Sequence, residues 1–310
     1  MKPASSVLLL TTLTGFGYGL LAWLAVFALF GGLPASRWFL PVAVVVALGF
    51  AAAGLVASML HLGRPERAWR AFSQWRSSWL SREGVASLVT FPPALGFAAL
   101  WWLVGGGAPV TIIVGLLAGA MGLVTVFCTA MIYASLKPIR QWHNAHTAPD
   151  YLVFALFSGA VLLALLLAGW TGADSRAALV ALVCALGAAG AKLAYWRFID
   201  AQPPLATLAS ATGLTGLGEV RQLDAPHFTE NYVLREMGYR IARKHAAKLR
   251  RITLGLAFLL PALLAALAAF GLVPVVMTII ATLCAAMGLF VERWLFFAEA
   301  THVSTLYYGR

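Results

Sequence analysis

The sequence predicts an all-α fold, a polytopic membrane protein in which eight transmembrane helices form a single bundle over residues 1–310. Two observations predict this class. Hydrophobic residues make up 61% of the 310 residues and charged residues only 11%, so the chain cannot supply the polar surface that a soluble domain of this size needs. Long apolar runs also recur along the chain, and a helix needs about 20 apolar residues to cross a bilayer core.

The apolar runs give the bounds of the expected helices. The predicted spans are Val7–Phe30, Phe39–His61, Gly84–Leu103, Pro109–Leu136, Tyr151–Trp170, Arg176–Phe198, Ile252–Leu272 and Pro274–Ala300. The first span is longer than the apolar core of a signal peptide and more spans follow it, so we interpret it as a retained helix. No internal repeat divides the spans into matching halves, which weighs against a transporter built from inverted repeats.

Positive charges are distributed unevenly between the two sides of the predicted bundle. Of the 22 lysines and arginines, only Arg37 and Arg176 fall in connections on one side, and all others outside the spans fall on the side of both termini. The positive-inside rule therefore predicts a bacterial inner-membrane protein whose termini and whose connections 62–83, 137–150 and 199–251 are cytoplasmic. The net charge of +11 thus reflects membrane orientation, and a nucleic-acid partner is not indicated.

Two cytoplasmic connections contain amphipathic segments. Trp69, Phe72 and Trp75 recur at near-helical spacing among arginines, which is typical of a short helix at the lipid headgroups. Residues 231–251 show a second amphipathic helical pattern, after an extended Pro- and Gly-rich stretch over 201–229. This last connection is either a solvated loop with a lipid-contacting helix or a docking surface for a soluble partner.

The cysteines and histidines are poorly placed for metal centres. Cys128, Cys184 and Cys284 are isolated within apolar stretches, which predicts buried apolar side chains and no iron–sulfur or zinc site. No histidine falls at mid-membrane, where a b-type haem has its paired ligands. Any electrons that enter this chain must therefore come from a partner at the cytoplasmic face.

A histidine and a glutamate stand on either side of the first cytoplasmic connection. The second span ends at His61 and the third begins beside Glu83, so a hairpin brings both to the same depth. With Arg64 and Arg82 nearby, these titratable groups can hold a quinone ring and exchange protons with its carbonyl oxygens. The alternative is that both are interfacial anchors or caps, since a helix N-terminus favours Glu83.

Other polar residues near the span ends are further candidates. Ser58, at the end of the second span, and Tyr133, at the end of the fourth, extend the candidate quinone site, although Tyr133 also suits an interface anchor. Four charged residues lie within or near the sixth and eighth spans: Lys192, Glu292, Arg293 and Glu299. Pairing among them would offset their burial, and an intramembrane proton path is the alternative.

Two stretches of the chain resemble a known family. Ser58-Met-Leu-His-Leu-Gly-Arg-Pro-Glu-Arg-Ala-Trp-Arg-Ala-Phe72, followed by Trp79-Leu-Ser-Arg-Glu83, resembles the membrane anchor subunits of dimethyl sulfoxide reductase-type molybdoenzymes. The resemblance covers nearly the whole chain and implies quinone-site roles for His61 and Glu83. It also implies partners at the cytoplasmic face: a catalytic subunit with a molybdenum bis-pterin cofactor and a ferredoxin-like subunit with four iron–sulfur clusters. The anchor itself would carry no metal.

Three further segments favour one branch of that family. Residues 132–143, 244–251 and 292–299 resemble the anchor of the cytoplasmic sulfite-oxidising enzyme, a sulfite dehydrogenase that reduces a quinone. This resemblance implies that electrons from sulfite pass to ubiquinone or menaquinone. The alternatives are an anchor that oxidises quinol for a dimethyl sulfoxide or polysulfide reductase and, less favoured, a transporter.

Overall fold

The computed structural model describes residues 4–60, 62–224 and 241–308, and the regular elements within these ranges are all helices. Eight helical segments there are long and apolar enough to cross a membrane, which confirms the all-α prediction. They are α1 (Ser5–Leu29), α2 (Phe39–Met59), α3 (Trp79–Leu103), α4 (Pro109–Ala134), α5 (Thr147–Thr171), α6 (Ser175–Ala201), a continuous seventh span, and α11 (Pro274–Ala298). A helix of 25 residues is about 37 Å long, enough to cross a hydrocarbon core of about 30 Å.

Local signals in the sequence set the helix ends. Pro109 and Pro274 occupy the first turns of α4 and α11, where the missing N–H leaves no hydrogen bond unmade. The Asp174 carboxylate accepts a hydrogen bond from the backbone N–H of Ala177 at 3.0 Å and caps α6. Gly172, with φ of 84°, ends α5 in a conformation that favours glycine. The connection between α5 and α6 is short for this reason.

Three spans begin earlier than the hydropathy pattern predicted. The Ser78 side chain caps α3, so that this helix begins at Trp79 rather than at Gly84 and places Glu83 inside it. Helix α5 begins at Thr147 rather than at Tyr151. Each correction has the same cause, because polar residues of a first helical turn lower the mean hydropathy without ending the helix.

The seventh span also begins earlier, and it contains a change of helix type. It runs through α9 (Ile241–Thr253), the π-helical segment η2 (Leu254–Leu259) and α10 (Leu260–Ala269). The amphipathic helix expected over 231–251 lies outside the described residues up to 240, and from Ile241 it continues directly into this span.

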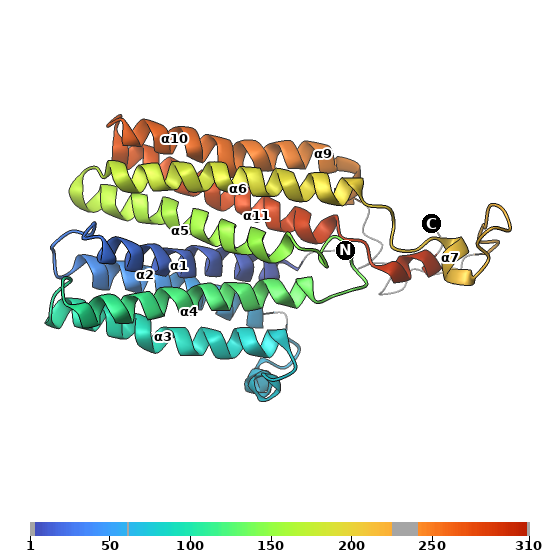
Figure 1. Cartoon of the computed structure of the whole chain (residues 1–310), viewed down its shortest axis with the longest axis horizontal. Coiled ribbons are helices and arrows are strands. Elements are labelled where there is room, and N and C mark those ends of the chain that lie inside the picture. The colour runs from blue at the N-terminus through green and yellow to red at the C-terminus, as the bar shows by residue number, and fades with distance from the viewer. Residues whose placement is uncertain (1–3, 61, 225–240, 309–310) are drawn as a thin grey trace.

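Within the described residues, three short helices lie outside the spans. η1 (Pro65–Gln74) confirms a helix between α2 and α3 and leaves Trp69 and Trp75 exposed. α7 (Leu208–Thr212) interrupts the stretch over 201–229 that was expected to be extended. η3 (Val303–Tyr308) follows α11, and an isolated bridge pairs Ile139 with His302. Figure 1 shows η1, α7 and both marked chain ends at the same end of the bundle.

Helices α1 and α5 are the two most buried spans and form the centre of the bundle. α1 packs against α2, α4 and α5, and α5 packs against α6 and α11. Their contact uses glycine on both sides: a Cβ on Gly19 would overlap the backbone of Ala155, and one on Gly159 would overlap that of Gly19. Small residues spaced by four allow helices in a membrane to approach this closely.

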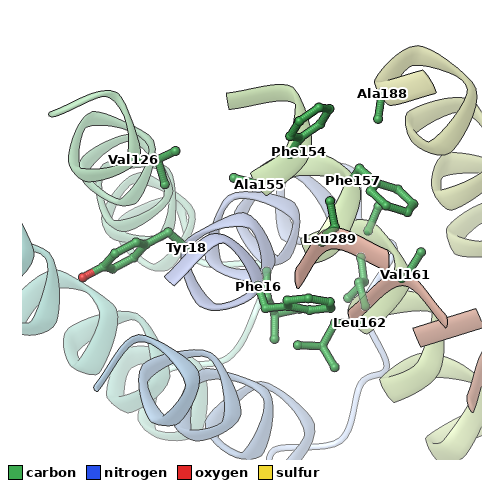
Figure 2. Close-up of a cluster of buried hydrophobic side chains, with 14 of the residues drawn as sticks. Phe16, Tyr18, Val126, Phe154, Ala155, Phe157, Val161, Leu162, Ala188 and Leu289 are labelled. Atoms are coloured by element: carbon green, nitrogen blue, oxygen red, sulfur yellow. The ribbon is translucent and has the colours of Figure 1, made fainter. Parts of the chain in front are cut away.

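The apolar core surrounds this contact. Figure 2 shows Phe154, Phe157 and Val161 gathered along α5, with Leu289 of α11 beside them. On α1, Phe16 points into this group, whereas Tyr18 points away from it, past Gly122 of α4 and toward α3. The same central pair therefore separates two sets of helices, α2–α4 on one side and α6–α11 on the other.

The glycine contact leads to a stability prediction. Gly159→Leu should destabilise the protein by at least about 2 kcal/mol, because the added side chain forces α1 and α5 apart. Gly187→Leu is the matched control, since Gly187 lies on the exposed face of α6 with no atom near its Cβ position. Thermal unfolding of the two purified variants in detergent checks this, and equal midpoints would contradict it.

Candidate functional site

A large cavity opens among α1, α2, η1, α3 and α4, at the end of the bundle that carries η1. Its volume is about 650 Å³, within the usual range for a small-molecule site. Most of its wall is apolar: Val7, Leu10, Leu55, Met59, Leu62, Ala68, Ala71, Phe72, Leu80, Leu88 and Ile132. Six polar side chains complete the lining: Ser58, Arg64, Arg67, Glu83, Ser87 and Tyr133. Such a cavity suits a mainly apolar ligand with a few polar atoms.

Glu83 is the acidic side chain among these lining residues. The cap at Ser78 places it in the second turn of α3, and it is 4% exposed. One carboxylate oxygen accepts a hydrogen bond from the Thr129 hydroxyl of α4 at 2.6 Å. A buried carboxyl group with one described side-chain donor can gain or release a proton where it meets a ligand, and carboxyl groups at such depth usually have a function.

The cavity owes part of its shape to Gly84. The Phe72 ring of η1 lies against this residue, where a Cβ would stand 2.7 Å from it. Arg64 and Arg67 of the same connection are exposed at the rim. The connection between α2 and α3 therefore forms a wall of the cavity, with cations at its opening.

Tyr133 and Ser58 lie on the lining as the sequence predicted. The Tyr133 ring is half-buried and stacks on Tyr151 with ring centres 6.0 Å apart, and edge contacts to Trp142 and Phe297 hold it in place. Ser58 donates a hydrogen bond to the carbonyl of Leu55 at 2.7 Å.

The structure turns Arg82 away from the cavity. Its guanidinium donates hydrogen bonds to the carbonyls of Trp75 at 3.0 Å and Arg76 at 2.7 Å, and it lies over the Trp79 ring. Arg82 thus fastens the end of the connection to α3. His61 lies outside the described residues, although Leu62 next to it lines the cavity.

Three residues at this candidate site were missed by the sequence analysis. Ser87 follows Glu83 at helical spacing, a signal that was available. Arg67 was one of several arginines with nothing to distinguish it, and the pairing of Thr129 with Glu83 joins residues 46 apart. No local pattern predicts such a contact.

A second buried polar group lies among α5, α6 and α11. The Lys192 ammonium is 2.5 Å from a carboxylate oxygen of Glu292, and the Arg293 guanidinium is 3.5 Å from the other oxygen. All three residues are at most 4% exposed. Asp150 is also buried, and the charges of these three residues act on its carboxyl group. The expected pairing of Lys192, Glu292 and Arg293 is confirmed.

Glu299 pairs elsewhere, with a cation that the sequence analysis did not single out. Arg250 of the seventh span donates one hydrogen bond to Glu299 at 2.8 Å and two to Asp200 at 2.6 and 2.9 Å. Burial raises the pKa of Glu299 above its usual value, and the Arg250 guanidinium opposes that rise. This pairing joins the ends of α6, α9 and α11 at the surface. Over the described ranges, no group of three histidine, cysteine or acidic side chains could hold a metal ion.

Comparison with known proteins identifies the family. The chain matches the DMSO reductase anchor subunit (DmsC) family over residues 1–309. It belongs to this family. A sulfite dehydrogenase subunit of Allochromatium vinosum is 34% identical to it over 99% of both chains. Anaerobic dimethyl sulfoxide reductase chain YnfH of Escherichia coli is 32% identical over 37% of this chain and 40% of its own length. The resemblance deduced from the sequence is confirmed, and this member of the family is a multi-pass membrane protein.

The buried ion pair of this anchor subunit leads to a second prediction. Glu292→Leu should lower the free energy of unfolding by about 3–5 kcal/mol, because it leaves the Lys192 cation buried without its closest partner. The double variant Lys192→Met/Glu292→Leu should recover part of this loss, because only Arg293 then lacks its carboxylate partner. Thermal unfolding of both variants checks the order, and a double variant no more stable than the single one would contradict it.

Proposed function

We propose that this chain is the quinone-reactive membrane anchor of a three-subunit oxidoreductase that passes electrons from sulfite oxidation to ubiquinone. The observation that carries the proposal is the cavity of about 650 Å³ with its apolar wall, its buried Glu83 and its two rim arginines. A quinone offers matching chemistry, because it has an apolar ring and tail and two carbonyl oxygens. The similarity to a sulfite dehydrogenase subunit over the full length supports the substrate.

Quinone reduction consumes two electrons and two protons, and the side chains of the cavity suit this demand. Glu83 donates a proton to one carbonyl oxygen of the quinone. The Thr129 hydroxyl holds the Glu83 carboxyl group from its other side through the 2.6 Å hydrogen bond. His61, whose neighbour Leu62 lines the cavity, serves the second carbonyl oxygen. Arg64 and Arg67 stabilise negative charge on the ring as electrons arrive, and Ser58 and Tyr133 orient it.

Partners dock at the end of the bundle that carries η1. We place this end in the cytoplasm of a bacterium, together with both termini and the connections 62–83, 137–150 and 199–251. The whole chain then forms a single membrane domain in the inner membrane. A ferredoxin-like iron–sulfur subunit would deliver electrons there from a catalytic subunit with a molybdenum bis-pterin cofactor. Trp69 of η1 and Trp75, which follows it, are exposed, and each lies under an arginine. Such side chains suit lipid headgroups beside the docking surface.

The pocket residues provide the test of this function. Glu83→Gln and His61→Asn should each lower quinone reduction by about 100-fold or more, because each removes a proton donor to the ring. Both variants should still assemble with the partner subunits. Turnover of a ubiquinone analogue by the purified complex is the measurement. Glu219→Gln is the matched control, since that carboxylate is exposed and pairs with Arg221 at the surface. Wild-type turnover in both pocket variants would exclude the site.

A second candidate is an anchor that works in reverse, oxidising quinol for the reduction of a sulfoxide or polysulfide. The similarity to dimethyl sulfoxide reductase chain YnfH favours it. The direction depends on the partner subunits, so an assay of the purified complex decides. We expect sulfite to reduce a ubiquinone analogue, and we expect reduced quinone with dimethyl sulfoxide to give at most a much slower reaction. The opposite ranking would favour the second candidate.

A further inference from the structure

Behind Glu83 lies a small buried cavity between the two polar groups of the bundle. It is formed by α1, α4, α5 and α11, and its volume of about 10 Å³ is close to that needed for a single water. Thr129, which donates to Glu83, forms one part of its wall, and Arg293, which pairs with Glu292, forms another. The cavity therefore joins the quinone pocket to the buried ion cluster.

The polar atoms around this small cavity suit a bound water. The Thr12 hydroxyl is buried beside it without a hydrogen bond to another described group, and the Tyr151 hydroxyl is buried beside it next to the Arg293 guanidinium. By contrast, the hydroxyls of Thr14 and Ser158 on the same wall donate to carbonyls of their own helices. Buried water occupies polar sites of this size when two to four partners surround it, and Thr12, Tyr151 and Thr129 supply three.

The ion cluster continues the polar path toward the cytoplasmic end. Lys192 contacts Glu292, and the Lys192 ammonium and the Arg250 guanidinium both lie over the Trp196 ring. Glu299 in turn is joined through Arg250 to Asp200, whose side chain is 57% exposed. Polar side chains thus run from the surface, through the interior of α5, α6 and α11, to the far side of Glu83.

A quinone in the large pocket makes such a path necessary. Glu83 is already 4% exposed, and an apolar ring in front of it would separate it from water on the pocket side. After Glu83 gives its proton to the ring, the replacement must come from behind. The Thr129 hydroxyl is the described side-chain hydrogen-bond partner on that side.

We propose that the ion cluster, the small cavity and Thr129 form a proton-conducting route from the cytoplasmic surface to Glu83, an inference that rests on the proposed quinone site. When Glu83 loses a proton to the quinone oxygen, the O–H bond of Thr129 breaks as that of Glu83 re-forms. In the same step Thr129 receives a proton from the water in the small cavity, and a proton that passes along the ion cluster from the cytoplasmic surface restores the water. One proton moves inward at each turn and no group is oxidised. Arg293 keeps its charge throughout and positions the water and Glu292.

The route is tested on the purified three-subunit complex with two variants. Lys192→Met/Glu292→Leu removes the Lys192–Glu292 pair together, so that Arg293 alone loses a carboxylate partner, and Thr12→Val removes a hydroxyl from the small cavity at nearly constant volume. Each should lower kcat for reduction of a ubiquinone analogue by at least about tenfold and leave its KM unchanged. Formic acid or hydrazoic acid, small weak acids that carry protons through the protein, should restore much of the lost rate. Thr278→Val is the matched control, because that threonine is buried at the opposite end of α11.

Two outcomes would overturn the route. One is wild-type kcat in both variants, and the other is a loss of kcat that the weak acids do not restore, which indicates structural damage. Glu83→Gln separates these from a failure of the quinone site. If Glu83→Gln loses turnover while both route variants retain it, the pocket stands and the route is wrong. If Glu83→Gln retains turnover, the proposed quinone site is wrong, and the proton route then has no acceptor to supply.

Discussion

The close contact between α1 and α5 is the constraint on which the rest of this bundle depends. In a bilayer, apolar side chains gain little from packing on one another rather than on lipid, so helix association relies on close fit. Gly19 and Gly159 provide that fit by letting the two backbones touch. With this pair at the centre, α2, α3 and α4 assemble on one side and α6, α10 and α11 on the other. Only the side chains beside α1 and α5 then separate the polar region around Glu83 from the polar region around Glu292.

The interior charges obey a second constraint, which is that each must be compensated inside the protein. Glu292 stands between two cations, and Arg293 also lies over the Tyr151 ring, 3.7 Å from its centre. Aromatic faces stabilise cations in this way without adding a charge. If stability were the only role of these buried charged groups, apolar side chains in their place would make the bundle more stable. Their presence at the same end of the helices as Glu83 therefore favours a role beyond packing.

Hydropathy and spacing predicted the architecture because a bilayer imposes a length on every helix. The eight spans follow from that length, and the starts at Phe39, Pro109 and Pro274 were predicted correctly. The start of α3 was not, because Ser78 extends this helix back past the apolar run. That shift of about one helical turn decides the site. It places Glu83 inside the helix, facing α4, and it leaves Arg82 on the side of Trp75 and Trp79.

The long-range pairs could not be predicted from the sequence. Lys192 and Glu292 are 100 residues apart, and only the packing of α6 and α11 against the same two helices, α5 and α10, brings them into contact. The sequence could show that such residues needed partners, and it did so correctly for Lys192, Glu292 and Arg293. It gave no reason to pair Glu299 with Arg250, because both lie at span ends, where water could have satisfied each of them.

Glu83 and Thr129 link the two polar regions because each has two neighbours. The carboxyl group faces the large pocket on one side and the Thr129 hydroxyl on the other, and that hydroxyl also borders the small cavity. A hydroxyl can donate and accept at once, so it transmits a proton without holding a charge in the low-dielectric interior. A second carboxylate in its place would repel Glu83, and an apolar side chain would end the path. Threonine is suited to this position because it is small and neutral, and because the carbonyl of Thr125 in its own helix is an alternative acceptor for the same hydroxyl proton.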